Sequence, residues 1–169
     1  MSTQGKTPRF ESKMCTPEEL EIRASQLPGV IVFTNGVFDL LHRGHVTYLD
    51  QAAQEGDSLI VAVNSDASVK RLGKGDDRPI NTQLDRMAVL AALDCVALVT
   101  WFEEDTPLNA ILASRPAVLV KGGDWAVEKM VGAREVQDWG GRAVSIQFDH
   151  QRSTTDTLAK IRRSGDTRA

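Results

Sequence analysis

Residues 30–45 read VIVFTNGVFDLLHRGH, and this stretch decides the fold. It opens with a continuous apolar run over 30–33, the pattern of a short strand buried on both faces of a sheet. A loop containing glycine follows, and then a helix that ends near Gly56 and whose expected apolar stripe is Val46, Leu49, Ala52 and Ala53. A strand, a glycine loop and a helix in this order are typical of the opening unit of a parallel α/β sheet.

The same alternation continues along the chain. Apolar runs predict strands over 59–63, 96–99, 118–120 and 143–146. Helices are expected from Thr82 (with an apolar stripe of Leu84, Met87, Ala88 and Ala91), from Thr106, over 131–139 and from Ser153. We therefore expect an α/β fold: a single doubly wound, Rossmann-like domain with a five-stranded parallel sheet and helices on both faces. It would span residues 14–169, include an N-terminal helix that starts at Thr16-Pro17, and follow a disordered leader over 1–13.

The composition of the chain argues against several classes of function. The chain has 169 residues, 41% of them hydrophobic and 25% charged, which indicates one soluble globular domain. Its 20 basic and 23 acidic residues give a net charge of −3, which argues against a general nucleic-acid binder. No apolar stretch approaches the ~20 residues of a membrane span, so no membrane partner is expected. Cys15 and Cys95 match no metal-ligand spacing, and we interpret them as reduced thiols of a cytoplasmic protein.

The loop after the first strand has the features of a phosphate site. In open α/β sheets, ligands bind beyond the carboxyl ends of the strands. Gly36 allows backbone amides to approach a phosphate closely, and Gly44 lies at a helix N-terminus, which attracts anions. His42 and His45 flank Gly44 and can donate hydrogen bonds to phosphate oxygens. The alternatives are two ordinary histidines, or a metal pair that lacks an evident third ligand; two of the three histidines in this one loop favour phosphate binding.

Later loops add further candidates. Lys121-Gly122-Gly123-Asp124 directly follows a buried strand, so its glycines allow close ligand approach and Asp124 can accept hydrogen bonds from ribose hydroxyls. The alternative for Lys121 is an ordinary surface lysine. Lys74 and Arg78 lie in a polar, glycine-containing loop that could close over a polyphosphate, although such a run is more often a solvated surface. Ser153 begins a capping box, whose hydroxyls and amides could also hold phosphate.

These motifs resemble a known family. Gly36-x-Phe38-Asp39-x-x-His42-x-Gly44-His45 is similar to the signature of the His-x-Gly-His nucleotidyltransferases, which include cytidylyltransferases and adenylyltransferases. Further segments resemble one branch, the heptose 1-phosphate adenylyltransferases of lipopolysaccharide precursor synthesis: VAVNSD at 61–66, RPIN at 78–81, Arg86, FEEDTP at 102–107, VKGGDW at 120–125 and STT at 153–155. Gln151 replaces a glycine common in relatives, and Arg43 occupies a position that is usually small.

The resemblance implies transfer of AMP from ATP to a heptose 1-phosphate, with Mg²⁺ bound through the ATP phosphates and no metal site made by the protein. It implies three catalytic residues, His42, His45 and Lys121, and contacts to the sugar phosphate from Asp39, Arg78 and Trp125. ATP contacts are expected from Asn35, Gly36, Val37, Phe38, Gly44, Lys74, Arg86, Gly122, Asp124, Ser153, Thr154 and Thr155. The chain length leaves no room for the sugar kinase fused to some relatives, so a separate upstream kinase is implied; the sequence leaves a homo-oligomer open.

Two other functions fit part of the sequence. A cytidylyltransferase acting on glycerol 3-phosphate or a similar alcohol phosphate would share the His-x-Gly-His and Ser-Thr-Thr motifs. A non-catalytic nucleotide sensor could use the same fold. Two histidines at the phosphate position argue against the sensor, because binding alone needs only backbone amides.

Overall fold

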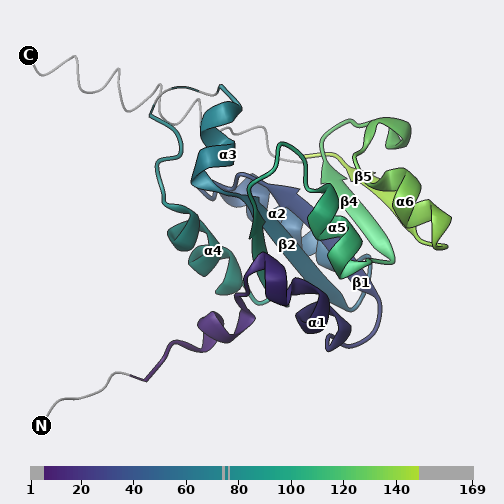
Figure 1. The fold of residues 1–169 in the computed structure, drawn as a ribbon, viewed down its shortest axis with the longest axis horizontal. Coiled ribbons are helices and arrows are strands. Elements are labelled where there is room, and N and C mark those ends of the chain that lie inside the picture. Colours follow the sequence, from purple (N-terminus) through teal and green to yellow (C-terminus); the bar gives the residue numbers. More distant parts are fainter. Residues whose placement is uncertain (1–5, 74, 76, 149–169) are drawn as a thin grey trace, which may run out of the picture.

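A computed structural model describes residues 6–73, 75 and 77–148 of the chain. Its centre is a five-stranded parallel sheet in the order β3-β2-β1-β4-β5 (Figure 1). The strands are β1 (Ile31–Gly36), β2 (Ser58–Asn64), β3 (Leu98–Phe102), β4 (Val118–Gly122) and β5 (Arg142–Ile146). The predicted fold class, strand number and parallel direction are confirmed.

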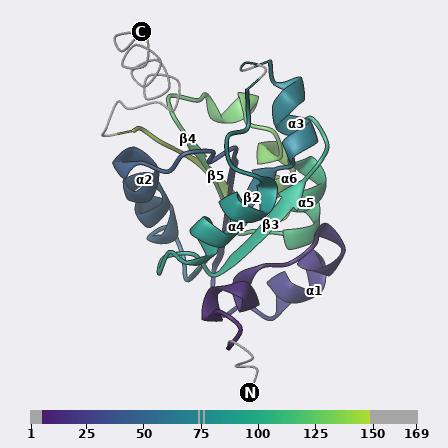
Figure 2. The ribbon, with the colours of Figure 1, turned by 90° about the vertical axis from the view of Figure 1, so that its left-hand side faces the viewer.

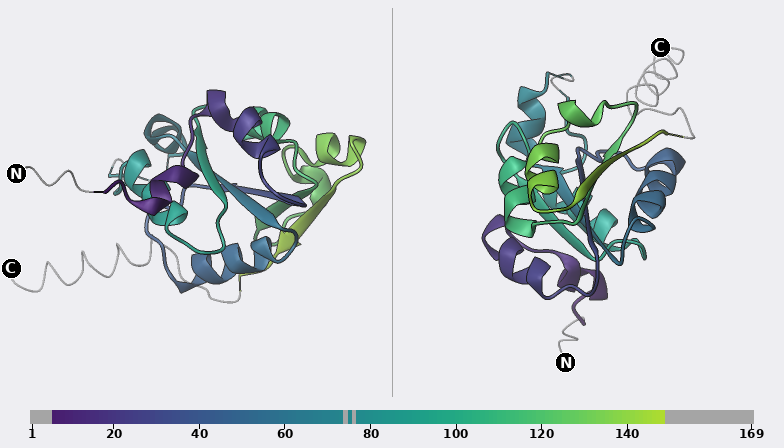
Figure 3. Two further views of the ribbon diagram at one scale, coloured as in Figure 1. Left: turned by 90° about the horizontal axis from the view of Figure 1, so that it is seen from below. Right: turned by 90° about the vertical axis from the view of Figure 1, so that its right-hand side faces the viewer.

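Helices cover both faces of the sheet. Residues of α2 (Arg43–Ala53) and α4 (Gln83–Ala91) share one buried cluster, and residues of α1 (Leu20–Ser25), α5 (Leu108–Ser114) and α6 (Ala133–Asp138) share the other. Figure 3 shows α2 on one side of the sheet and α1 and α5 on the opposite side. Neighbouring strand residues point to different clusters, as Val32 and Phe33 do, and this explains why the strands read as uninterrupted apolar runs.

The N-terminal segment is more ordered than the sequence predicts. A 3₁₀ helix, η1, occupies Arg9–Lys13, so the predicted disorder over 1–13 is wrong for these residues. Phe10 packs against the core and Lys13 Nζ donates to the Leu93 carbonyl oxygen, which fixes the segment. Met14 then forms a parallel bridge with Val99 at the β3 edge. A second 3₁₀ helix, η2 (Pro17–Glu19), leads into α1. Figure 2 shows η1 and α3 (Asp66–Arg71) at opposite ends of the sheet.

Local details differ from the sequence predictions in three ways. Val46 and Leu84 were expected to face the core, but they are 42% and 67% exposed, because Tyr48 and Leu90 take the buried positions of their helices. The helix α3 was not predicted, and Ser65 caps it by accepting a hydrogen bond from Ser68 N. A third 3₁₀ helix, η3 (Val127–Lys129), precedes α6. The helix expected from Ser153 lies outside the described residues. Within the described part of the chain, no helix has the length and apolar character to cross a membrane.

Candidate active site

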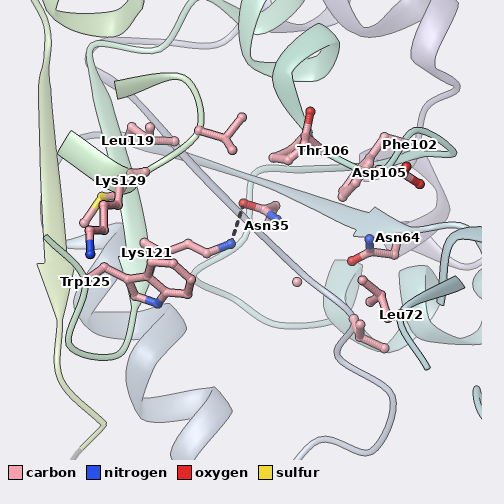
Figure 4. Close-up of a pocket in the computed structure, with 15 residues that line it drawn as sticks. Asn35, Asn64, Leu72, Phe102, Asp105, Thr106, Leu119, Lys121, Trp125 and Lys129 are labelled. Carbon is pink, nitrogen blue, oxygen red and sulfur yellow. Dashed lines mark hydrogen bonds between the residues drawn. The ribbon is translucent and has the colours of Figure 1, made fainter. Parts of the chain in front are cut away.

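The candidate site lies where β1 and β4 end side by side. These two strands pair in parallel, while the chain leaves β1 towards α2 on one face and enters β4 from α5 on the other. Such a reversal of strand order is where ligands bind in doubly wound sheets. Lys121 at the end of β4 donates from Nζ to Asn35 Oδ1 at the end of β1, at 3.2 Å (Figure 4).

A cavity of about 470 Å³ opens beside this pair, on the α5 and α6 side of β1. Its floor is apolar and includes Leu119, Phe102 and Met130. The polar side chains around it come from the ends of several strands and the following loops: Asn35, Asn64, Asp105, Thr106, Lys121 and Lys129. Apolar walls with a few convergent polar groups are typical of small-molecule sites.

The sequence predicted part of this lining and missed the rest. Asn35, Gly36, Val37, Lys121 and Trp125 were predicted site residues, and all five line the cavity. Other lining residues were given no role, among them Asn64, Asp105, Thr106, Lys129 and Met130. The sequence contained features that could have indicated three of these residues. Asn64 ends a buried strand, and Asp105 and Thr106 belong to the FEEDTP segment.

Trp125 stands at the edge of the cavity on a tightly folded loop. The residue is 47% exposed, and Nε1 of its indole donates to the Gly122 carbonyl oxygen at 3.1 Å. Gly123 has φ +111°, a conformation that side chains disfavour, so glycine is required for this turn. The Lys121 ammonium lies 5.9 Å from the centre of the indole ring, within range of a cation–π interaction. Figure 4 shows Lys121 passing the Trp125 ring towards Asn35.

The two histidines lie at the start of α2, with His42 in the N-cap position. Their rings stack, with centroids 3.9 Å apart and planes inclined by 24°. Neither lines the cavity described above. Burial, followed by the neighbouring His42, lowers the pKa of His45 to about 4, so its imidazole is neutral at neutral pH. A hydrogen bond between the His45 ring and the Leu40 backbone opposes this lowering of the pKa, while Nδ1 of the ring is buried and has no partner within hydrogen-bond geometry among the described residues.

Phe38 links this pair to the preceding loop. Its ring meets His45 edge-on, with centroids 5.5 Å apart, and the residue is only 7% exposed. Its φ of +48° is unusual for a residue with a side chain and costs of order 1–3 kcal/mol. A Cβ on Gly36 would lie 2.9 Å from the Phe38 ring, so this position needs glycine for close packing. The strained loop and the imidazole pair therefore form one packed unit.

Asp39 and Arg78, the predicted sugar-phosphate contacts, are buried against each other. Arg78 Nε donates to Asp39 Oδ2 at 2.6 Å, and the two side chains are 6% and 0% exposed. Asp39 Oδ1 also accepts from the backbone N–H groups of Ile80 and Asn81, at 2.9 Å each. The structure thus differs from the prediction: the carboxylate holds the 78–81 segment on the loop after β1, and it has no exposed surface for a ligand.

Arg86 also differs from its predicted ATP contact. Its side chain has no exposed surface. The guanidinium donates to three carbonyl oxygens, those of Val37, Asn64 and Asn81, and to Asp66 Oδ1. It is therefore committed to the backbone of the protein and does not face the cavity.

The remaining predicted residues fall into two groups. Gly44 is buried in the first turn of α2, Asp124 is exposed, and Gly122 lies against the Phe148 ring, which a Cβ would strike. Lys74, Gln151, Ser153, Thr154 and Thr155 lie outside the described residues.

Comparison with known proteins gives related sequences and folds. The chain is 59% identical to the D-beta-D-heptose 1-phosphate adenylyltransferase of Bordetella bronchiseptica, over 91% of this chain and 96% of that protein. It is 53% identical to the bifunctional protein HldE of Geobacter sulfurreducens, over 78% of this chain but only 26% of that protein. A lipopolysaccharide core biosynthesis protein from Thermoplasma volcanium has a similar fold, with a TM-score of 0.61, 24% identity, and coverage of 74% of this chain and all of that one.

The family model described as cytidylyltransferase-like matches residues 33–159, a range that contains the end of β1, the histidine pair, the residues that line the cavity and the Trp125 loop. This match covers well over half of the chain. The chain belongs to the cytidylyltransferase-like family of nucleotidyltransferases.

Proposed function

We propose that this protein transfers AMP from ATP to D-β-D-heptose 1-phosphate, releasing pyrophosphate and forming ADP-heptose for the lipopolysaccharide core. The observation that carries this proposal is the 59% identity to a D-beta-D-heptose 1-phosphate adenylyltransferase along nearly the whole of both chains. The site geometry supports it, because the start of α2 and an apolar cavity ringed by a few polar side chains lie at the same edge of the sheet.

The reaction needs orientation more than proton transfer. An oxygen of the sugar phosphate attacks the α-phosphorus of ATP, and the bond from that phosphorus to the oxygen bridging to the β-phosphate breaks. The second pKa of a phosphate monoester is near ~6, so the attacking group is largely dianionic at neutral pH and requires no general base. The tasks left to the protein are to align the substrates and to stabilise the charge that develops on the leaving pyrophosphate.

The start of α2 suits the phosphates of ATP. The helix has 11 residues, enough for an effective dipole, and its first backbone N–H groups lack partners within the helix. His42 and His45 stand at this end and supply hydrogen-bond donors. Because His45 is neutral before ATP binds, an arriving phosphate favours its protonated form and draws a proton to it. We propose that Ser153, Thr154, Thr155 and Lys74 add contacts to the same phosphates.

The cavity on the other side of β1 suits the sugar phosphate. Lys121 is placed between the two regions, beside Asn35, where it can contact the anionic groups of both substrates. Asn64, Thr106 and Asp105 offer hydrogen-bonding groups to sugar hydroxyls, and Trp125 offers an exposed aromatic surface at the edge. Gly122 and Asp124, which follow Lys121, are proposed to contact the ribose of ATP.

Mg²⁺ is expected to arrive with ATP. Among the described residues, no group of three or more His, Cys, Asp or Glu side chains is placed to hold a metal ion. We propose that the ion is bound by the phosphate oxygens of the nucleotide. We propose that a separate sugar kinase acts upstream of this protein.

Pyrophosphate release tests the proposal. The purified protein is assayed with ATP or CTP, each combined with D-β-D-heptose 1-phosphate or glycerol 3-phosphate. ATP with the heptose phosphate should give the fastest release, and omission of either should abolish it. Faster release from CTP with glycerol 3-phosphate would show that the protein is the alternative cytidylyltransferase. ATP binding without release in any combination would show a nucleotide sensor.

A further inference from the structure

Arg86 is a buried cation placed between the segments that build the site. It lies on α4, where it is 1% exposed, and it makes four hydrogen bonds. Nη1 donates to the Val37 carbonyl at 2.8 Å, while Nη2 donates to the Asn64 carbonyl and to Asp66 Oδ1, both at 2.8 Å. These partners belong to the loop after β1, to the end of β2 and to the start of α3.

The hydrogen bond from Arg86 to Val37 holds the peptide next to Phe38, the residue of this loop with a positive φ. The Val37 carbonyl belongs to the peptide that precedes Phe38, whose φ is +48°. On the other side of Phe38, Asp39 is fixed by Arg78 and by two backbone N–H groups. Phe38 is therefore held between two buried anchors, and its ring in turn packs edge-to-face with the His45 ring.

We propose that Arg86 is a positioning residue for nucleotidyl transfer: it holds the peptide before Phe38, so that the Phe38 ring keeps His45 stacked on His42 at the start of α2. This inference rests on the proposed function for its catalytic consequence, but the positioning itself does not depend on which substrate is used. Arg86 does not line the cavity, and its hydrogen bond to Val37 connects it to the loop before Phe38, so we propose that it acts through this loop.

The geometry explains why an arginine stands here. The planar guanidinium presents five N–H donors in fixed directions, and this one serves three carbonyls and a carboxylate at once. A lysine at this position would keep the charge, but its single nitrogen could not reach partners that lie on three separate segments. Arg86→Lys is therefore a sharp test, because it preserves the charge next to Asp66 and removes the fork.

The experiment compares Arg86→Lys with Arg134→Lys, a matched change at a 91% exposed arginine on α6. Turnover, the KM for ATP and thermal melting are measured together with the titration of the His45 ring by NMR. We expect turnover to fall about 10²-fold, the effect of a displacement of about 1 Å in a catalytic group, with a KM for ATP close to the parent's. We also expect the pKa of His45 to rise from about 4 towards 6.5 as the ring loses its packing. Arg134→Lys should change neither the turnover nor the pKa of His45.

A residue that only stabilises the fold would give a different result. Folded Arg86→Lys protein with parental turnover and an unchanged His45 titration would overturn the inference. If Arg86→Lys does not fold, Asp66→Asn decides, because Asp66 is 41% exposed and contributes one of the charged contacts to Arg86. Asp66→Asn should lower turnover about tenfold, as expected for one weakened charge-assisted hydrogen bond. It should also raise the pKa of His45, as Arg86→Lys does. If neither the turnover nor the pKa of His45 changes, the inference is overturned. If the proposed substrates are wrong, the parent fails in the pyrophosphate assay while the titration still reports on Arg86.

Discussion

The two sides of β1 are built on different principles. On the α2 side, the loop after β1 is buried at Phe38 and Asp39, strained at Phe38 and anchored by Arg86 and Asp39. On the other side, the cavity carries exposed groups such as Asp105 and Trp125 on loops that follow the strands. Stabilising a developing charge requires donors that are fixed and desolvated before the reaction. Recognising a polyhydroxylated sugar phosphate requires accessible polar groups, so the contrast assigns charge stabilisation to one side and recognition to the other.

Loss of an imidazole on the α2 side should have the largest effect. His45→Ala should lower turnover by about 10²–10³, the usual loss for one preorganised donor, and leave ATP affinity nearly unchanged. Its melting temperature should stay close to the parent's. Turnover, ATP binding and thermal melting are measured on one preparation, with Val46→Ala, at an exposed position of the same helix, as the control. A histidine that only packs would show the opposite pattern: a lower melting temperature with turnover nearly intact.

Loss of the cation between the two sides should have a smaller effect. Lys121→Ala removes the contact to Asn35 and a charge that borders the cavity. Hydrogen bonds to charged groups contribute about 1.5–3 kcal/mol, so kcat/KM should fall roughly 10- to 100-fold while the melting temperature changes little. Lys6→Ala, at an exposed lysine outside the helices and strands, provides the matched control in the same kinetic assay. Unaltered kcat/KM in Lys121→Ala would remove this lysine from the site.

The desolvation of His45 also predicts how stability depends on pH. Its pKa is lowered to about 4 in the folded protein from an ordinary value of 6.5, so the unfolded chain binds more protons between these pH values. The free energy of unfolding should therefore decrease as the pH falls from 6.5 to 4. Denaturant unfolding at pH 7 and pH 5 measures this, and His45→Gln should show a weaker dependence than the parent. An equal dependence in both proteins would mean that His45 is not desolvated.

The smallest effect is expected at the edge of the cavity. Trp125→Leu removes the aromatic surface and the hydrogen bond from Nε1 to Gly122, both of which are solvent-accessible. We expect a few-fold rise in the KM for the sugar phosphate and little change in kcat, because recognition changes and the imidazole pair does not. Initial rates at varied sugar phosphate distinguish the two constants. A loss of kcat as large as that of His45→Ala would erase the distinction between the two sides.

The fold was predictable because its signals are local. The buried strands read as continuous apolar runs, and their alternation with capped helices restricts the connections to a parallel, doubly wound sheet. Errors occurred where tertiary packing decided the outcome. Val46 is apolar, like Leu49 and Ala52 of the same helix, but it is exposed. Tyr48 is buried in its place, and the Tyr48 hydroxyl forms a hydrogen bond with Thr34 Oγ1 at 2.5 Å. The order of η1 likewise depends on the docking of Phe10 on a distant core.

The site was predictable only in part. Asn35, Lys121 and Trp125 line the cavity, and the sequence indicated this place for them because they lie at or just beyond the ends of buried strands, where sheets of this type bind ligands. Arg78 was expected to face a ligand because it is cationic, and Arg86 because of the resemblance to the family. A sequence does not show that their partners in the folded protein are a buried carboxylate and three backbone carbonyls. The same limitation hid the strain at Phe38, which follows from φ and not from residue type.

The central claim is that the desolvated imidazole pair meets the phosphates of ATP, and the NMR titration of His45 with and without nucleotide tests it most directly. In the free protein its pKa should be about 4. With saturating ATP, the phosphate charge should raise this pKa to its ordinary value of 6.5 or above, and ATP binding near pH 6 should take up a proton. A His45 titration that stays the same when ATP is bound would contradict the account.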